Sequence, residues 1–214
     1  MQEHGIRYIV NACASIESLK DTEELMEQYP FVYGAFGIHP DDAEKMTEET
    51  LEEIRQLSRL PKAVAIGEIG LDYYWHKEEH EHEIQKKMFL AQMEIAREEK
   101  LPFMVHSRDA AKDTLDLVKD CMKGGMYGGI IHCFSYGKEM AREYLDMGLY
   151  LGIGGVVTFK NAKKLKEVVA YAPLEQLVLE TDSPYLSPEP NRGKRNSSLN
   201  LPYVAEAIAQ IKGC

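Results

Sequence analysis

Seven short apolar runs, each followed by a polar or amphipathic segment, recur along this chain of 214 residues. Most of the runs are continuously apolar, which is typical of parallel strands covered on both faces. In chain order they span residues 8–12, 31–36, 63–69, 101–105, 129–134, 149–153 and 177–180. A chain with this rhythm is predicted to fold into a parallel α/β structure.

The segments between these runs have helical spacing. Ile84, Met88, Ala91 and Ile95 recur as one stripe of a helix, and shorter stripes occupy residues 51–57, 162–169 and 203–211. Thr47, followed by two glutamates, has the character of a helix N-cap. Seven strand-then-helix units favour a TIM-type (β/α)8 barrel. An open doubly wound sheet is the alternative, but the glycines of residues 152–155 lack the spacing of its phosphate loop.

Length and charge narrow the classes of protein further. The chain suits one domain, residues 1–214, with no internal linker or repeat. Its net charge of −10 argues against nucleic-acid binding through a broad basic surface. No apolar run approaches the roughly 20 residues that a membrane helix needs. The four cysteines have no C-x-x-C spacing, which predicts reduced thiols and a cytoplasmic protein.

Polar residues stand where a barrel enzyme carries its active site. The carboxyl ends of the strands form that site, and five of the seven predicted strands end in His, Glu or Asp. These residues are His39, Glu68 with Asp72, His106, His132, and Glu180 with Asp182. Burying several such groups together is costly unless a cation joins them, because imidazole and carboxylate supply its ligands. The pattern therefore predicts a metal site.

Five ordered motifs carry a family resemblance. They are GIHP at 37–40, GEIGLDYY at 67–74, HSR at 106–108, HCFS at 132–135 and ETDSPYLSPEPNRGKRN at 180–196. Together they resemble the TatD family of metal-dependent hydrolases over almost the whole chain. The resemblance implies a barrel of the amidohydrolase kind and divalent-metal-dependent deoxyribonuclease activity, with single-stranded DNA or strand ends as the substrate.

The resemblance also implies a role for four residues. Glu68 resembles the carboxylate that bridges two metal ions, and His106 and His132 resemble the ligands of one ion. Asp182 resembles the ligand of the other, which also helps to activate water. Glu68 and Asp182 are thus the predicted catalytic pair. The resemblance implies two divalent ions per complete site, which would be Mg, Mn or Zn.

Other side chains suit a phosphodiester substrate. His39, Arg108 and Arg192 are predicted to contact a phosphate, since an arginine can hold two of its oxygens at once. Around Arg192, a solvated basic loop is the competing interpretation. Tyr73, with the two aromatic residues after it, can stack on a base, although packing over the barrel rim explains these rings equally well.

The chain departs from the family pattern at both ends. The family begins with a strand ending in His-x-His, whereas this chain begins with residues that resemble the tail of the following helix, and His4 cannot substitute. The other His-x-His, at residues 80–82, is predicted to be helical, with its imidazoles about 200° apart. We therefore expect a chain lacking strand 1 and part of the last helix, because such barrels take about 250 residues. The metal shared with Asp182 is then weak or absent.

Three functions remain compatible with the sequence. The first is a deoxyribonuclease, an exonuclease, that uses two-metal water activation. The second is the same barrel acting on another ester or amide. The third is a shortened form of weak or no activity that binds nucleic acid or a partner. The metal, the cutting polarity and the oligomeric state stay open.

Overall fold

The computed structural model describes residues 5–214, so His4 lies outside the described part. The chain forms two compact units. One runs from Tyr8 to Ile130, and the other from Ile131 to Cys214 together with residues 5–7. Each unit repeats the alternation of strands and helices.

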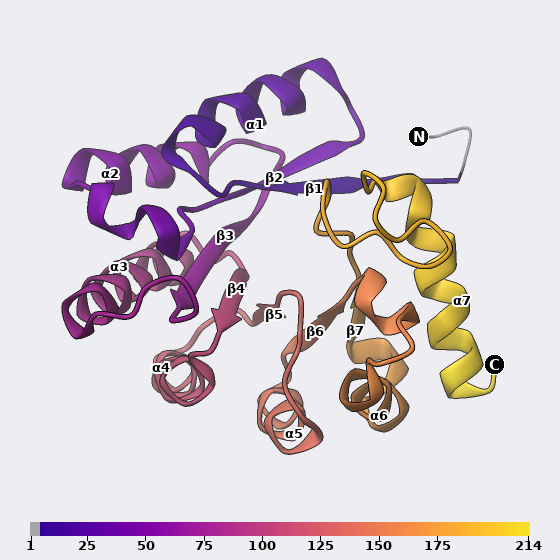
Figure 1. Ribbon diagram of the computed structural model, residues 1–214. Coiled ribbons are helices and arrows are strands. Elements are labelled where there is room, and N and C mark those ends of the chain that lie inside the picture. The colour runs from indigo at the N-terminus through magenta and orange to yellow at the C-terminus, as the bar shows by residue number, and fades with distance from the viewer. Residues whose placement is uncertain (1–4) are drawn as a thin grey trace. The chain divides into compact units, whose positions relative to one another are not determined.

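The first unit contains four parallel strands in chain order, and α1, α2 and α3 lie on one side of them (Figure 1). The strands are β1 (Ile9–Ala12), β2 (Val32–Phe36), β3 (Ala63–Asp72) and β4 (Phe103–Arg108). The helices are α1 (Ile16–Gln28), the 3₁₀ helix η2 (Pro40–Lys45), α2 (Glu48–Leu57), α3 (Glu79–Glu98) and α4 (Ala111–Lys123). Strand β5 (Gly129–Ile131) lies at the boundary of the units.

The second unit pairs its two strands in parallel. These are β6 (Tyr150–Ile153) and β7 (Leu177–Leu179). The helices are α5 (Lys138–Asp146), η3 (Gly155–Thr158), α6 (Lys163–Tyr171), η4 (Leu174–Gln176), η5 (Ser198–Asn200) and α7 (Leu201–Lys212). All seven predicted strands are therefore confirmed, in the β/α alternation of a TIM-type fold.

Local sequence explains where the helices begin and which face they bury. Thr47 caps α2 as predicted, because its hydroxyl accepts a hydrogen bond from the Thr50 N–H at 3.3 Å. The buried face of α3 includes Ile95 of the predicted stripe, but it otherwise lies one residue beyond that stripe, with Gln85 and Gln92 beside Phe89. Two buried amides on an apolar face call for hydrogen-bond partners. Among residues 5–214, no helix combines the length and apolar character that crossing a bilayer requires.

An irregularity in β3 lies at the residue that the site needs. Ile66 pairs with Phe103 and Ile69 with Val105, so three steps along β3 oppose two along β4. One extra residue in a strand forms a bulge, which redirects the side chains beside it. Gly67 fits here because a Cβ at this position would lie 2.6 Å from the Cβ of Met104. Glu68 follows directly.

Candidate metal centre

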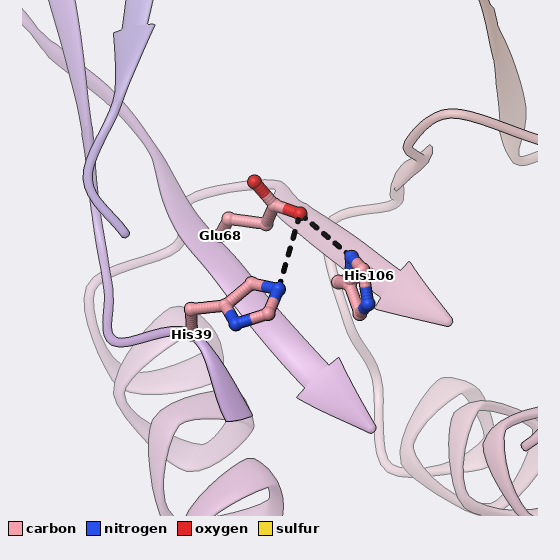
Figure 2. A group of neighbouring side chains, drawn as sticks. All are labelled: His39, Glu68 and His106. Carbon is pink, nitrogen blue, oxygen red and sulfur yellow. Dashed lines mark hydrogen bonds and ion pairs between the residues drawn. The ribbon is translucent and has the colours of Figure 1, made fainter. Parts of the chain in front are cut away.

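Three side chains from β3, β4 and the segment after β2 converge in the first unit. His39 follows β2, Glu68 belongs to β3 and His106 to β4. Both imidazoles point toward the Glu68 carboxylate (Figure 2). Its Oε1 lies 2.9 Å from His106 Nδ1 and 3.9 Å from His39 Nε2. One ligand atom from each residue lies within 4.8 Å of the others, an arrangement that can hold one metal ion.

His39, which the sequence assigned to the phosphate, thus stands among the possible metal ligands. Its Nδ1 lies 3.3 Å from Asp41 Oδ2. The same Nδ1 accepts the Asp41 backbone N–H at 3.2 Å, and Nε2 is the ring nitrogen that faces Glu68. The hydrogen bond from His39, opposed by burial, and a further bond from His76 lower the pKa of Asp41 to about 2. Asp41 therefore stays a carboxylate behind His39.

Asp72 supports His106 in the same way. Its Oδ2 lies 3.1 Å from His106 Nε2, which leaves Nδ1 facing Glu68. Although burial of the imidazole opposes the charge, the bonds to Asp72 and Glu68 raise the pKa of His106 to about 9. Burial also opposes ionisation of Asp72, but the bonds from His106 and two backbone N–H groups lower its pKa. The sequence placed Asp72 at a strand end without giving it this role.

Replacing Asp72 by Asn is expected to weaken metal binding about 10- to 100-fold, the usual cost of losing a carboxylate behind a histidine ligand. The amide keeps the shape but removes the charge that holds His106. Metal titration followed by calorimetry measures the change. Asp120→Asn, at an exposed site paired with Lys123, is the matched control and should leave the affinity unchanged. Equal affinities for the two variants would contradict the role of Asp72.

The other predicted ligands form a second cluster, in the unit that begins at Ile131. His132 Nε2 lies 3.3 Å from Asp182 Oδ1, and its Nδ1 lies 2.8 Å from Glu180 Oε2. The second Glu180 oxygen accepts the Cys133 N–H at 2.8 Å. Gly152 makes room for this carboxylate, because a Cβ there would lie 2.1 Å from Glu180 Oε2. Glu180 therefore orients His132, a role that the sequence did not reveal.

The predicted substrate residues have separate neighbours. Tyr73 stacks on His82, with ring centroids 3.6 Å apart, and its hydroxyl donates to Asp113 at 2.9 Å. Burial and the bond to Asp113 raise the pKa of Tyr73. Arg108 lies over the exposed ring of Tyr74, two residues after the end of β3. Arg192 lies in the second unit, with its guanidinium carbon 4.1 Å from the centre of the Phe159 ring.

The His-x-His of residues 80–82 is helical, as predicted. His80 and His82 lie in the first turn of α3. His82 stacks on Tyr73, and its Nε2 lies 3.0 Å from the carbonyl oxygen of His76. The interpretation that this pair belongs to a helix start is therefore confirmed.

Comparison with known proteins identifies the family. The family model described as "TatD related DNase" matches residues 1–214. The uncharacterized metal-dependent hydrolase YabD of Bacillus subtilis is 50% identical over 190 residues, which cover 88% of this chain and 73% of YabD. The chain belongs to the TatD family.

Two further relatives extend the comparison. The 3'-5' ssDNA/RNA exonuclease TatD of Salmonella typhimurium is 32% identical over 215 residues, covering 98% of this chain and 81% of that protein. The crystal structure of YjjV, a TatD homologue from Escherichia coli, superposes with a TM-score of 0.89 at 29% identity and covers 98% of this chain and 80% of its own. TatD relatives thus share the TIM-type fold, and the family is one of metal-dependent hydrolases.

Proposed function

We propose that the chain is a divalent-metal-dependent hydrolase of phosphodiester bonds in DNA that acts on single strands from an end. The observation that carries this proposal is the Glu68 carboxylate between the imidazoles of His39 and His106. Two nitrogen ligands and one carboxylate are a common set for a catalytic metal, because they leave a coordination position for water or substrate.

The proposed ligands are Glu68, His106, His132 and Asp182, and the geometry adds His39. Divalent ions held by these ligands would supply Lewis acidity, which would make water a stronger nucleophile and neutralise charge on the phosphate. The protein orients the ligands through the carboxylates behind them. Asp182 is proposed to take the proton that the attacking water loses.

The substrate assignment draws on the relatives and on charge. The Salmonella relative is named as an exonuclease of single-stranded DNA and RNA that proceeds from the 3' end. Arg108 and Arg192 are the proposed phosphate contacts, and both are exposed. The proposal treats residues 1–214 as one catalytic domain. It places the domain in the cytoplasm, in keeping with the free thiols of Cys13, Cys121 and Cys214.

A strand-shortening assay tests the function. A single-stranded DNA labelled at its 5' end is incubated with the protein and Mg²⁺, Mn²⁺ or Zn²⁺, with chelator as the control. We expect a ladder of shortening products that chelator abolishes. RNA and duplex DNA of the same sequence define the preference. No cleavage with any of these metals, alongside turnover of a small carboxylic ester or amide, would favour the alternative hydrolase. Binding without turnover of any substrate would favour the non-catalytic form.

A further inference from the structure

A cluster of exposed aromatic and cationic side chains follows β3. Trp75 is 66% exposed and Tyr74 is 42% exposed, with their rings edge to face at 4.7 Å. The Arg108 guanidinium carbon lies 3.9 Å from the centre of the Tyr74 ring and 5.6 Å from that of Trp75. Lys77 Nζ lies 5.4 Å from the Tyr74 ring. Rings of this size left in water beside two cations form a surface suited to a flat, anionic ligand.

Asp72 fixes this cluster relative to the metal centre. One carboxylate oxygen accepts the backbone N–H groups of Tyr74 at 2.9 Å and Trp75 at 3.1 Å. The other oxygen lies against His106. Arg108 comes two residues after His106 on β4, and side chains at this spacing share a face of the strand. The same carboxylate therefore positions a metal ligand and the exposed rings.

The Tyr74 and Trp75 rings differ in what covers them. Arg108 covers the Tyr74 ring, whereas Trp75 keeps most of its surface in solvent. A base can stack on Trp75 while the guanidinium of Arg108 binds the phosphate beside it. These two cations supply local positive charge on a chain of net charge −10. A duplex buries the faces of its bases, so the chemistry selects a single strand.

We propose that Trp75, with Arg108 held on Tyr74, is a stacking platform for a base of a single-stranded nucleic acid next to the metal centre. This proposal rests on the proposed function, because it names the surface that binds the single-stranded substrate. Stacking on a ring tolerates every base, so the platform gives strand selectivity without sequence preference.

Fluorescence provides a direct test, since Trp75 is the one tryptophan in the chain. The metal-loaded protein is titrated with a single-stranded phosphorothioate oligonucleotide that resists cutting. We expect quenching of the tryptophan emission, and much less quenching with an oligonucleotide that lacks its bases. Because Trp75→Ala has no tryptophan, its affinity is measured by the anisotropy of a dye-labelled strand. It should bind the intact strand about tenfold more weakly, within the range measured for base–aromatic stacking. It should bind the abasic strand as the parent protein does.

Controls separate stacking from folding. Trp75→Phe keeps a ring and should recover most of the affinity. Tyr127→Ala removes another exposed ring, which is 67% exposed and precedes β5, and should leave binding unchanged. With cleavable DNA, Trp75→Ala should raise KM about tenfold and change kcat little, because the ring binds the strand and does not touch the reacting atoms.

The outcomes also separate this inference from the proposed function. Base-dependent quenching and weaker binding by Trp75→Ala support the platform even if no DNA is hydrolysed, in which case the function alone fails. Hydrolysis of DNA with no quenching, and with an unchanged KM for Trp75→Ala, would overturn the platform and leave the function standing. Equal loss of affinity for intact and abasic strands would also overturn it, because the ring would then act on the backbone.

Discussion

Replacing Glu68 by Gln is expected to abolish metal-dependent hydrolysis, with a loss of at least about 100-fold in kcat/KM, beyond the usual cost of altering a group behind a ligand. Glutamine has the same size but carries no charge. Its amide would place a neutral group 2.9 Å from His106 Nδ1 and 3.9 Å from His39 Nε2, where the carboxylate now stands. The centre then keeps two imidazoles and loses the charge that offsets a divalent cation.

Metal content and turnover should fall together. Metal bound per chain is measured by plasma emission after dialysis, and turnover by the strand-shortening assay. Glu79→Gln makes the same chemical change at an exposed position in the first turn of α3 and is the matched control. Full turnover by Glu68→Gln would exclude Glu68 as a metal ligand. Normal metal content with lost turnover would confine its role to the reaction itself.

The strands were predictable because their evidence is local. Continuous apolar runs bounded by polar residues mark buried parallel strands, and each of the seven proved to be one. The cap of α2 was predictable for the same reason, since Thr47 and Thr50 lie within one turn. Strand ends in His, Glu and Asp likewise predicted where polar groups gather, as His39, Glu68 and His106 do.

The supporting groups were not predictable because their partners are distant in sequence. Asp72 meets a histidine 34 residues later, and Glu180 meets one 48 residues earlier. In the sequence, a carboxylate at a strand end that binds metal cannot be distinguished from one that orients a histidine ligand of the metal. The signal for Asp72 was nearby, because an Asp followed by an irregular segment commonly accepts backbone N–H groups two residues on. The sequence likewise does not distinguish the roles of Tyr73 and Trp75. In the structure the Tyr73 ring stacks on His82, whereas the Trp75 ring is exposed.

The bulge in β3 had no sequence signal that separates it from a regular strand. Residues 63–69 read as one apolar run with Glu68 near its end. The register against β4 gains a residue between Ile66 and Ile69, and this gain sets the direction in which Glu68 points. A pairing with another strand decides that direction, so the sequence of β3 alone does not contain it.

Two buried glutamines of α3 connect the helix to the ends of the strands. Gln92 accepts the Ile38 N–H at 2.7 Å and donates to the Ile38 carbonyl at 3.2 Å. Gln85, two turns earlier on the same face, makes the same pair of bonds to the backbone of Asp72. Ile38 precedes His39, and Asp72 contacts His106. The two amides thus set the backbone that carries the metal centre.

Replacing Gln92 by Leu is expected to lower the free energy of unfolding by about 3 kcal/mol. Leucine suits the apolar face, but it leaves the N–H and the carbonyl of Ile38 buried without these partners, at about 1–3 kcal/mol each. Urea unfolding followed by circular dichroism measures the change. Gln56→Leu is the matched control, because its amide donates to Glu52 on the exposed side of α2. Its effect should stay within about 0.5 kcal/mol.

A second glutamine variant separates the loss of two bonds from the change in shape. Gln92→Glu keeps an acceptor for the Ile38 N–H but, as a carboxylate, has no hydrogen to give the Ile38 carbonyl. If the amide acts as a clamp, both variants should also weaken metal binding, since His39 follows Ile38 directly. A stable Gln92→Leu protein with unchanged metal affinity would show that the position of His39 after β2 does not depend on Gln92. The apolar packing around Phe89 and Met93 would then be what fixes α3 against the strands.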